Sequence, residues 1–122
     1  RSHLAPIMEE IKARGLLYLD NRATQQGVAG ALATELGVPY AINNRFLDLA
    51  QASRVAVDDR LRQLERVARD TGAAVAMGQL YPVTIERVRE WARDVESRGF
   101  VLTPISALAA STLAARDEAR AE

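Results

Sequence analysis

The sequence contains no cysteine, and only one of its 122 residues is a histidine. The lack of cysteine excludes disulfides, thiolate metal sites and a cysteine nucleophile. The single histidine, His3, cannot form a metal site alone, because a metal centre needs several converging ligands. The remaining ligands of that kind are carboxylates, and these are scattered along the chain. We therefore expect this chain to hold no metal or other cofactor by itself.

The chain also lacks an excess of either charge and any long apolar run. Lysine plus arginine and aspartate plus glutamate each total 16, so no global field favours nucleic acid or an anionic membrane. A membrane helix needs about 18 consecutive apolar residues, and no stretch approaches this length. The start of the chain shows no secretory signal pattern. We therefore expect no nucleic-acid partner and no membrane-spanning segment.

What the sequence does contain is a recurrent unit of helix, glycine and strand. With 48% hydrophobic and 26% charged residues, the chain has the balance of one globular domain. Four amphipathic stretches each end at a glycine, which tolerates the left-handed conformation that ends helices, and a short β-prone run follows. The glycines are Gly15, Gly37, Gly72 and Gly99. The expected strands are residues 16–20, 38–42, 73–77 and 100–103.

Apolar residues three and four positions apart predict helices that lie on a core. The stripes are Leu4, Ile7, Met8 and Ile11, then Val28, Leu32 and Leu36, then Val57, Leu61, Leu64 and Ala68, and finally Ile85, Val88, Ala92 and Val95. Charges at i, i+4 spacing on the opposite faces predict exposed ion pairs within single helices. The expected pairs are Asp58 with Arg62, Glu65 with Arg69, and Asp94 with Arg98.

The expected strands are almost uniformly apolar, which is typical of a parallel sheet covered on both faces. Alternation of strands with helices predicts right-handed crossovers between them. We therefore predict an α/β fold with four short parallel strands alternating with helices. After Thr103 and Pro104 the chain becomes rich in alanine, and residues 109–122 are expected to be a helical or frayed tail.

Parallel α/β folds bind ligands beyond the carboxyl ends of their strands, where the loops converge. Polar side chains follow three of the four expected strands directly. The candidate site residues are Asp20, Arg22, Asn43, Arg45, Asp48, Gln79 and Tyr81.

Each candidate has a functional and a structural interpretation. Asp20 can orient a catalytic group, or it can form a structural ion pair with Arg22 or Arg45. Asn43 can bind sugar hydroxyls, yet asparagine is also a common turn residue. Tyr81 offers a ring for stacking on a sugar and a phenol for hydrogen bonding, or it is an aromatic residue at the rim.

Arg45, Asp48 and Trp91 also have alternative interpretations. Arg45 and Asp48 flank the apolar pair Phe46 and Leu47, so the charged residues either face a cleft or close a salt bridge. Trp91 follows the apolar stripe of its helix and is interpreted as core packing.

Several motifs together resemble one family, the divergent polysaccharide deacetylases. Their order and spacing match from about Ile7 to Leu108. The motifs are Gly15–Thr24 (GLLYLDNRAT), Ala31–Tyr40 (ALATELGVPY), Arg45–Asp48 (RFLD), Ala74–Gly78 with Tyr81 and Pro82, and Gly99–Leu108 (GFVLTPISAL).

The resemblance implies a distorted (β/α) barrel related to metal-dependent carbohydrate deacetylases, which are exported to the periplasm or secreted. In that fold a divalent metal polarises the acetyl carbonyl and activates water, while a base and an acid move the protons. The match covers the C-terminal half of the family pattern, on residues 1–108. The family's N-terminal half carries its aspartates and histidine motif, so a zinc-like metal is expected only together with that half.

The chain departs from the family pattern at Gln79. The pattern resembles Gly-His-Pro-Tyr-Pro, whereas this sequence has glutamine and leucine at Gln79 and Leu80. Histidine transfers protons near neutral pH and glutamine does not. The enzymatic status therefore stays open.

Three functional hypotheses follow. The first is a deacetylase-like, carbohydrate-active domain of the cell envelope, with Asp20 as candidate catalytic residue and a glycan or peptidoglycan-like polysaccharide as partner. The second is a non-enzymatic envelope module that binds glycan or protein in the same groove. The third is a small stand-alone doubly wound domain. Under the first two, open strand edges require the missing N-terminal half or self-association to cover them.

Overall fold

The computed structural model describes residues 3–21 and 28–109 and divides the chain into two compact units. Unit 1 comprises residues 1–42 and 104–122, and unit 2 comprises residues 43–103. Arg22 and residues 110–122 of the Ala-rich tail lie outside the described residues. Within the described ranges, no helix combines the length and the apolar character needed to cross a membrane.

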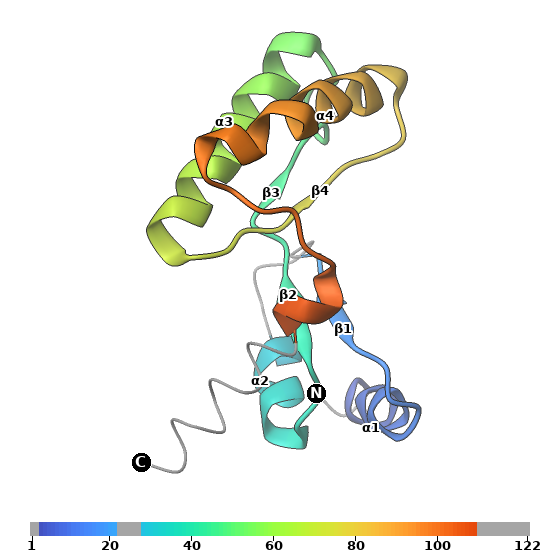
Figure 1. Cartoon of the computed structure of the whole chain (residues 1–122). Helices are drawn as coiled ribbons and strands as arrows, with labels where there is room; N and C mark the ends of the chain where they lie inside the picture. The colour runs from blue at the N-terminus through green and yellow to red at the C-terminus, as the bar shows by residue number, and fades with distance from the viewer. Residues whose placement is uncertain (1–2, 22–27, 110–122) are drawn as a thin grey trace. The chain divides into compact units, whose positions relative to one another are not determined.

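Unit 1 contains the helices α1 and α2 and one pair of strands, and residues 105–109 are also helical (Figure 1). The elements are α1 (Ala5–Ala13), β1 (Tyr18–Asp20), α2 (Val28–Leu36) and β2 (Tyr40–Ile42). The strands are parallel, with Tyr18 opposite Tyr40 and Asp20 opposite Ile42. This pairing confirms two of the expected strands, each shortened at its start, and their predicted parallel direction.

The core of unit 1 lies where α1, α2 and the strands meet. Its buried members are Met8, Ala29, Leu32, Ala33, Val38 and Tyr40. The predicted stripe of α1 is confirmed only in part, because Met8 is 0% exposed whereas Ile7 is 56% exposed. Neighbouring residues on a helix point about 100° apart, so one edge of a broad stripe can leave the core.

Unit 2 also contains a parallel strand pair, together with two longer helices (Figure 1). The elements are β3 (Arg45–Phe46), α3 (Arg54–Thr71), β4 (Ala76–Met77), α4 (Pro82–Asp94) and a short 3-10 helix, η1 (Val95–Arg98). Arg45 lies opposite Ala76, and Phe46 lies opposite Met77.

The helix α3 has well-defined ends. The Ser53 hydroxyl accepts a hydrogen bond from the Ala56 N–H at 3.1 Å, which satisfies a free donor of the first turn. Gly72 ends the helix with φ +93°, as the sequence predicts, and the other three joint glycines also have positive φ. Val57 and Leu61 from α3 form a core with Leu47, and Trp91 packs against it as expected.

The positions of two strands differ from the sequence expectation. Residues 45–46 were expected in a loop but form β3, because the Asn44 N–H donates to the Val75 carbonyl at 2.8 Å and extends the ladder with β4. Residues 100–103 were expected as a strand but form none, and Val101 is 81% exposed. A strand requires a neighbour for its backbone groups. The α/β class is confirmed, and the described residues contain no closed sheet.

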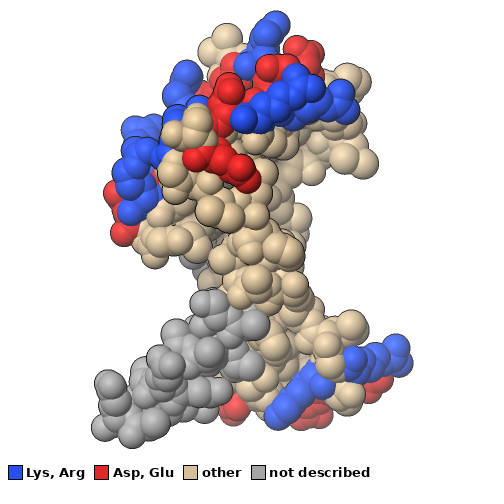
Figure 2. Space-filling model, viewed as in Figure 1, with Lys and Arg blue, Asp and Glu red and all other residues tan. Residues whose placement is uncertain are grey.

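The two shortest ion pairs of unit 2 join different helices, whereas the sequence predicted pairs within one helix. Asp58 accepts from the Arg87 Nε of α4 at 2.7 Å, and Glu65 accepts from the Arg98 Nη2 at 2.5 Å. Figure 2 shows acidic and basic side chains interspersed over these helices. Asp58 and Glu65 therefore have closer partners than the predicted Arg62 and Arg69, because the packing of α3 against α4 brings cations from later in the chain beside them. Arg69 still attracts Glu65, and Asp94 still attracts Arg98 as predicted, both at longer range than a direct ion pair.

The surroundings of Glu65 predict that unit 2 loses stability in acid. Burial by itself raises the pKa of Glu65, but hydrogen bonds from Arg98 and from the Trp91 indole N–H outweigh it, so its pKa lies below the ordinary 4.5. A lowered folded-state pKa stabilises the fold above pH 4.5, and this contribution disappears as the pH falls through the folded-state value.

We therefore expect Glu65→Gln to lower the free energy of unfolding by about 1–2 kcal/mol near neutral pH. The difference from the wild type should shrink steadily as the pH falls below 4.5. Urea unfolding across the pH range measures it. The control is Glu86→Gln, which removes an exposed carboxylate whose contact with Arg54 is 3.9 Å long. A constant gap between wild type and Glu65→Gln at all pH values would contradict the prediction.

Candidate functional site

The candidate site lies where β3 and β4 end. Because the two strands are parallel and Phe46 pairs with Met77, the chain leaves both strands at the same edge of the sheet. One departing segment, residues 47–53, leads into α3. The other, residues 78–81, leads into α4 and is called the 78–81 loop.

A buried carboxylate joins these two segments. Asp48 is 4% exposed, and its Oδ1 and Oδ2 accept hydrogen bonds from the Gln79 N–H at 3.0 and 2.9 Å. Oδ2 also accepts from the Thr84 hydroxyl at 2.6 Å, on the first turn of α4. Hydrogen bonds to an ionised carboxylate are stronger than neutral ones. Asp48 therefore fixes the 78–81 loop at both of its ends.

Gly78 allows this close approach. A Cβ atom at position 78 would lie 3.1 Å from the Thr84 Cγ2 and 3.5 Å from the Asp48 Oδ2. The first distance is tighter than ordinary van der Waals contact, so a side chain here would press on Thr84. The glycine at this point serves packing around the carboxylate.

The loop presents three side chains to solvent. Gln79, Leu80 and Tyr81 are all exposed, and Tyr81 adopts an extended conformation directly before Pro82 begins α4. The fixed backbone beneath them limits the positions that an amide and a phenol ring can occupy. Such a pair can donate and accept hydrogen bonds and can stack against an apolar ring face.

The predicted residues Asn43 and Arg45 have different surroundings. Asn43 is buried in unit 2, whereas Arg45 is partly exposed. The Arg45 Nε donates to the Gln63 Oε1 at 3.2 Å, and its Nη1 donates to the Asn44 carbonyl at 2.8 Å. Arg45 therefore reaches towards α3, and no salt bridge joins it to Asp48.

The two remaining predicted residues belong to unit 1. Asp20 is the last residue of β1, lies opposite Ile42 and is partly buried. Arg22 lies outside the described residues. The structure thus brings Asp48, Gln79 and Tyr81 together in unit 2. Roles in substrate binding or catalysis stay predictions for all seven residues.

The sequence did not point to Thr84 as a partner of Asp48, or to the contact of Asn44 with Val75 before the two strands. Thr84 lies 36 positions after Asp48, and the Asn44 Oδ1 accepts from the Val75 N–H at 2.8 Å across 31 positions. No short spacing links such pairs. The only available signals were a threonine in the first turn of a helix and a glycine directly after a strand.

The metal implied by the family resemblance does not fit the described residues. Among them, no three His, Cys, Asp or Glu side chains come together as a ligand group. The buried carboxylate of Asp48 is surrounded by an amide N–H and a hydroxyl, which are hydrogen-bond donors. That environment suits a carboxylate that holds a loop.

Comparisons with known proteins identify the family of the chain and a similar solved structure. The model of the divergent polysaccharide deacetylase family matches residues 1–109. The crystal structure of an uncharacterized protein from Agrobacterium tumefaciens C58 is similar, with a TM-score of 0.85 and 30% sequence identity. The similarity covers 88% of this chain and 44% of that protein, so the chain spans less than half of its length. A comparison with curated proteins found no match.

Proposed function

The chain belongs to the divergent polysaccharide deacetylase family, and from this premise we propose that it supplies one wall of a glycan-binding groove. The groove belongs to a polysaccharide-deacetylase-like domain of the cell envelope, located in the periplasm or secreted. The wall is the edge of unit 2 at which the 78–81 loop exposes Gln79 and Tyr81.

The observation that carries this proposal is the Asp48 carboxylate beneath the loop. It holds the Gln79 N–H and the Thr84 hydroxyl at hydrogen-bond distance, so the loop is oriented before any ligand arrives. Preorganisation reduces the entropy lost on binding, which favours recognition of a weakly binding, well-hydrated ligand such as a sugar. Tyr81 then offers its ring to the apolar face of a sugar, and Gln79 offers its amide to hydroxyl or acetamido groups.

We propose further that the strands are part of a distorted (β/α) barrel. Both strand pairs are parallel and short, as barrel strands would be. Because the chain spans 44% of the structurally similar protein, a longer protein of that kind has additional chain that can supply further strands. Residues 100–103, which are neither helical nor paired as a strand in the described structure, are the position for one such pairing.

The role of this chain in catalysis is binding and orientation. Gln79 holds a hydrogen bond but cannot act as a general acid, and Asp48 is occupied by loop contacts. Gln79 therefore favours a second candidate function, a non-enzymatic module that binds glycan in the same groove. Acetate release from acetylated chitooligosaccharides by a longer protein that includes this chain distinguishes the enzyme from the module.

The test of glycan binding is a nuclear magnetic resonance titration of the 122-residue chain with N-acetylated chitopentaose. We expect the amide resonances of residues 78–81 to shift, and Tyr81→Ala to weaken binding about tenfold. Gln79→Ala should weaken it about fivefold, because one hydrogen bond is lost.

Two matched variants make this test specific. Tyr81→Phe keeps the ring and should retain most of the affinity, whereas Val101→Ala shortens an exposed side chain outside the loop and should change nothing. The proposed groove would be contradicted if Tyr81→Ala bound chitopentaose as tightly as the wild type. It would also be contradicted if only amide resonances outside residues 78–81 shifted.

A further inference from the structure

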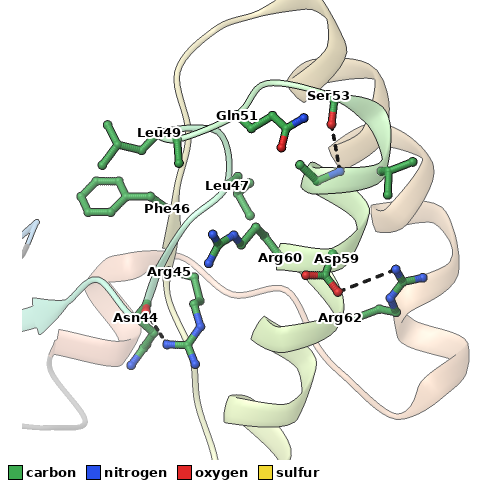
Figure 3. Close-up of a pocket in the computed structure, with 13 residues that line it drawn as sticks. Asn44, Arg45, Phe46, Leu47, Leu49, Gln51, Ser53, Asp59, Arg60 and Arg62 are labelled. Carbon is green, nitrogen blue, oxygen red and sulfur yellow. Dashed lines mark hydrogen bonds and ion pairs between the residues drawn. The ribbon is translucent and has the colours of Figure 1, made fainter.

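A second feature of unit 2 is an open depression between β3 and the first turns of α3 (Figure 3). Its volume is about 680 Å³. Phe46, Leu49 and Val55 give it apolar walls, and Arg45 and Arg60 enter it from the strand and from the helix. Figure 3 shows Arg60 extending from α3 towards β3, on the side of the helix that faces Arg45.

The guanidinium of Arg45 is oriented by neutral partners. Its Nε donates to the Gln63 Oε1 at 3.2 Å, and its Nη1 donates to the Asn44 carbonyl at 2.8 Å. Neither acceptor carries a formal charge. These hydrogen bonds therefore hold the side chain in place while its positive charge is retained.

Arg60 is partly buried, and its charge is likewise not neutralised by a carboxylate of the described residues. Over the described ranges 3–21 and 28–109, no ion pair joins Arg45 or Arg60 to a carboxylate. Asp59, the acidic residue of the depression, interacts with Arg62 at 3.9 Å and with the Gln63 amide at 2.9 Å. The lining has three arginines and one aspartate, so it is net positive.

Two other arginines of unit 2 show the contrasting case. Arg87 contacts the Asp58 carboxylate at 2.7 Å, and Arg98 contacts Glu65 at 2.5 Å. Each of these charges is neutralised within the fold. Within the part of the chain that the structure describes, Arg45 and Arg60 lack the carboxylate partner that these two arginines have. Because a partly desolvated charge without a counter-ion is unfavourable, an anion bound beside Arg45 and Arg60 would be stabilised.

We propose that this depression binds a carboxylate group of an acidic polysaccharide. A guanidinium fork matches the two oxygens of a carboxylate, and two guanidiniums from different elements can hold one group from two sides. The apolar walls formed by Phe46 and Leu49 suit the C–H face of the sugar ring that carries the carboxylate. The glycan nature of the ligand rests on the proposed function, whereas the anion preference rests on the arginines alone.

The depression is adjacent to the glycan wall along the chain. Leu49 lines it, and the preceding residue, Asp48, holds the 78–81 loop. An acidic sugar in the depression would therefore extend the glycan contact of unit 2 beyond Gln79 and Tyr81. This assigns the substrate class as a polysaccharide that carries carboxylates.

The experiment uses the 122-residue chain with two probes of equal length, trigalacturonate and its neutral methyl ester. Binding is followed by isothermal titration and by the arginine Nε–Hε resonances. We expect trigalacturonate to bind at least about tenfold more tightly than the ester, and Arg60→Gln to remove this preference. Arg66→Gln, the same charge change at an exposed position of α3 outside the depression, should keep it.

The outcomes separate the possible explanations. Equal loss in Arg60→Gln and Arg66→Gln would show general charge attraction and overturn the site, as would equal affinity of the wild type for both probes. A third outcome distinguishes this site from the groove at the 78–81 loop. If Tyr81→Ala leaves binding of the methyl ester unchanged while the carboxylate preference still requires Arg60, the site in the depression stands and the groove is rejected. Thermal melting of Arg60→Gln checks that the fold is intact.

Discussion

Replacing Asp48 with alanine is expected to lower the free energy of unfolding by about 2–4 kcal/mol, the largest loss for any polar residue of unit 2. The substitution removes the acceptor of the Gln79 N–H and of the Thr84 hydroxyl. Thr84 is itself buried, so its hydroxyl would remain desolvated without this partner. Urea unfolding followed by circular dichroism measures the change.

Variants of the same contact separate its parts. Asp48→Asn keeps one acceptor oxygen but turns an amide donor towards other donors, so its loss should fall between those of the wild type and the alanine variant. Thr84→Ser keeps the hydroxyl and should lower the free energy of unfolding only slightly. Thr84→Val deletes the hydroxyl and should lower it more. A loss below about 1 kcal/mol for Asp48→Ala would mean that the buried carboxylate does not hold the loop.

The same variants bear on glycan binding. If Asp48 acts by orienting the 78–81 loop, Thr84→Val should weaken chitopentaose binding, whereas Thr84→Ser should keep it close to that of the wild type. Hydrogen exchange of the Gln79 amide reports this directly, because its N–H donates to the Asp48 carboxylate. If the Gln79 amide exchanges faster in the Asp48 variants than in the wild type while the other amides are unchanged, Asp48 is a positioning residue.

A second large effect is expected in unit 1, where Met8→Ala should lower the free energy of unfolding by about 2–5 kcal/mol. Met8 is 0% exposed and lies in the core beside Leu32 and Val38. Its truncation leaves a cavity that the surrounding side chains fill only in part. Hydrogen exchange should show the loss of protection in the amides of α1, α2, β1 and β2.

The neighbouring residue provides a matched control. Ile7 belongs to the same predicted stripe of α1 but is 56% exposed, so Ile7→Ala should change stability by less than about 1 kcal/mol. Both variants shorten an apolar side chain on adjacent positions of one helix. Similar losses for Ile7→Ala and Met8→Ala would show that α1 is buried on a different face.

Much of the local structure could be predicted because it depends on nearby residues. Gly15, Gly37, Gly72 and Gly99 all adopt the left-handed conformation that the sequence predicts. The stripe of α3 is buried at Val57, Leu61 and Leu64 as expected. Capping and helical periodicity act within a few residues, so a single sequence contains the relevant information.

The strand pairing was predicted less well. The parallel direction of both pairs follows from apolar runs alternating with helices, and it is confirmed. Arg45 and Phe46 were expected in a loop, because a polar Asn-Asn-Arg run has no strand signal of its own. Their strand arises from the Val75 and Met77 carbonyls about 30 positions later, which accept from this segment.

The candidate site shows the same division. Gln79 and Tyr81 were predicted because they follow an apolar run, and both are exposed, while their binding role stays a prediction. Asp48 was predicted to line a groove, whereas its oxygens hold the Gln79 N–H and the Thr84 hydroxyl. Arg60 was not among the candidate residues of the sequence. Its position in the depression depends on where β3 packs beside α3.

The sequence by itself determined the family, the α/β class, the helix ends and the loops that carry polar residues. These depend on local conformational preference and on apolar periodicity, both of which are encoded within short stretches. Only the tertiary structure decided which cation pairs with Glu65, which hydroxyl completes the Asp48 contacts, and that Arg45 and Arg60 line one depression. Hydrogen bonds and charges act over a few ångströms, and folding brings such groups together from distant positions in the chain.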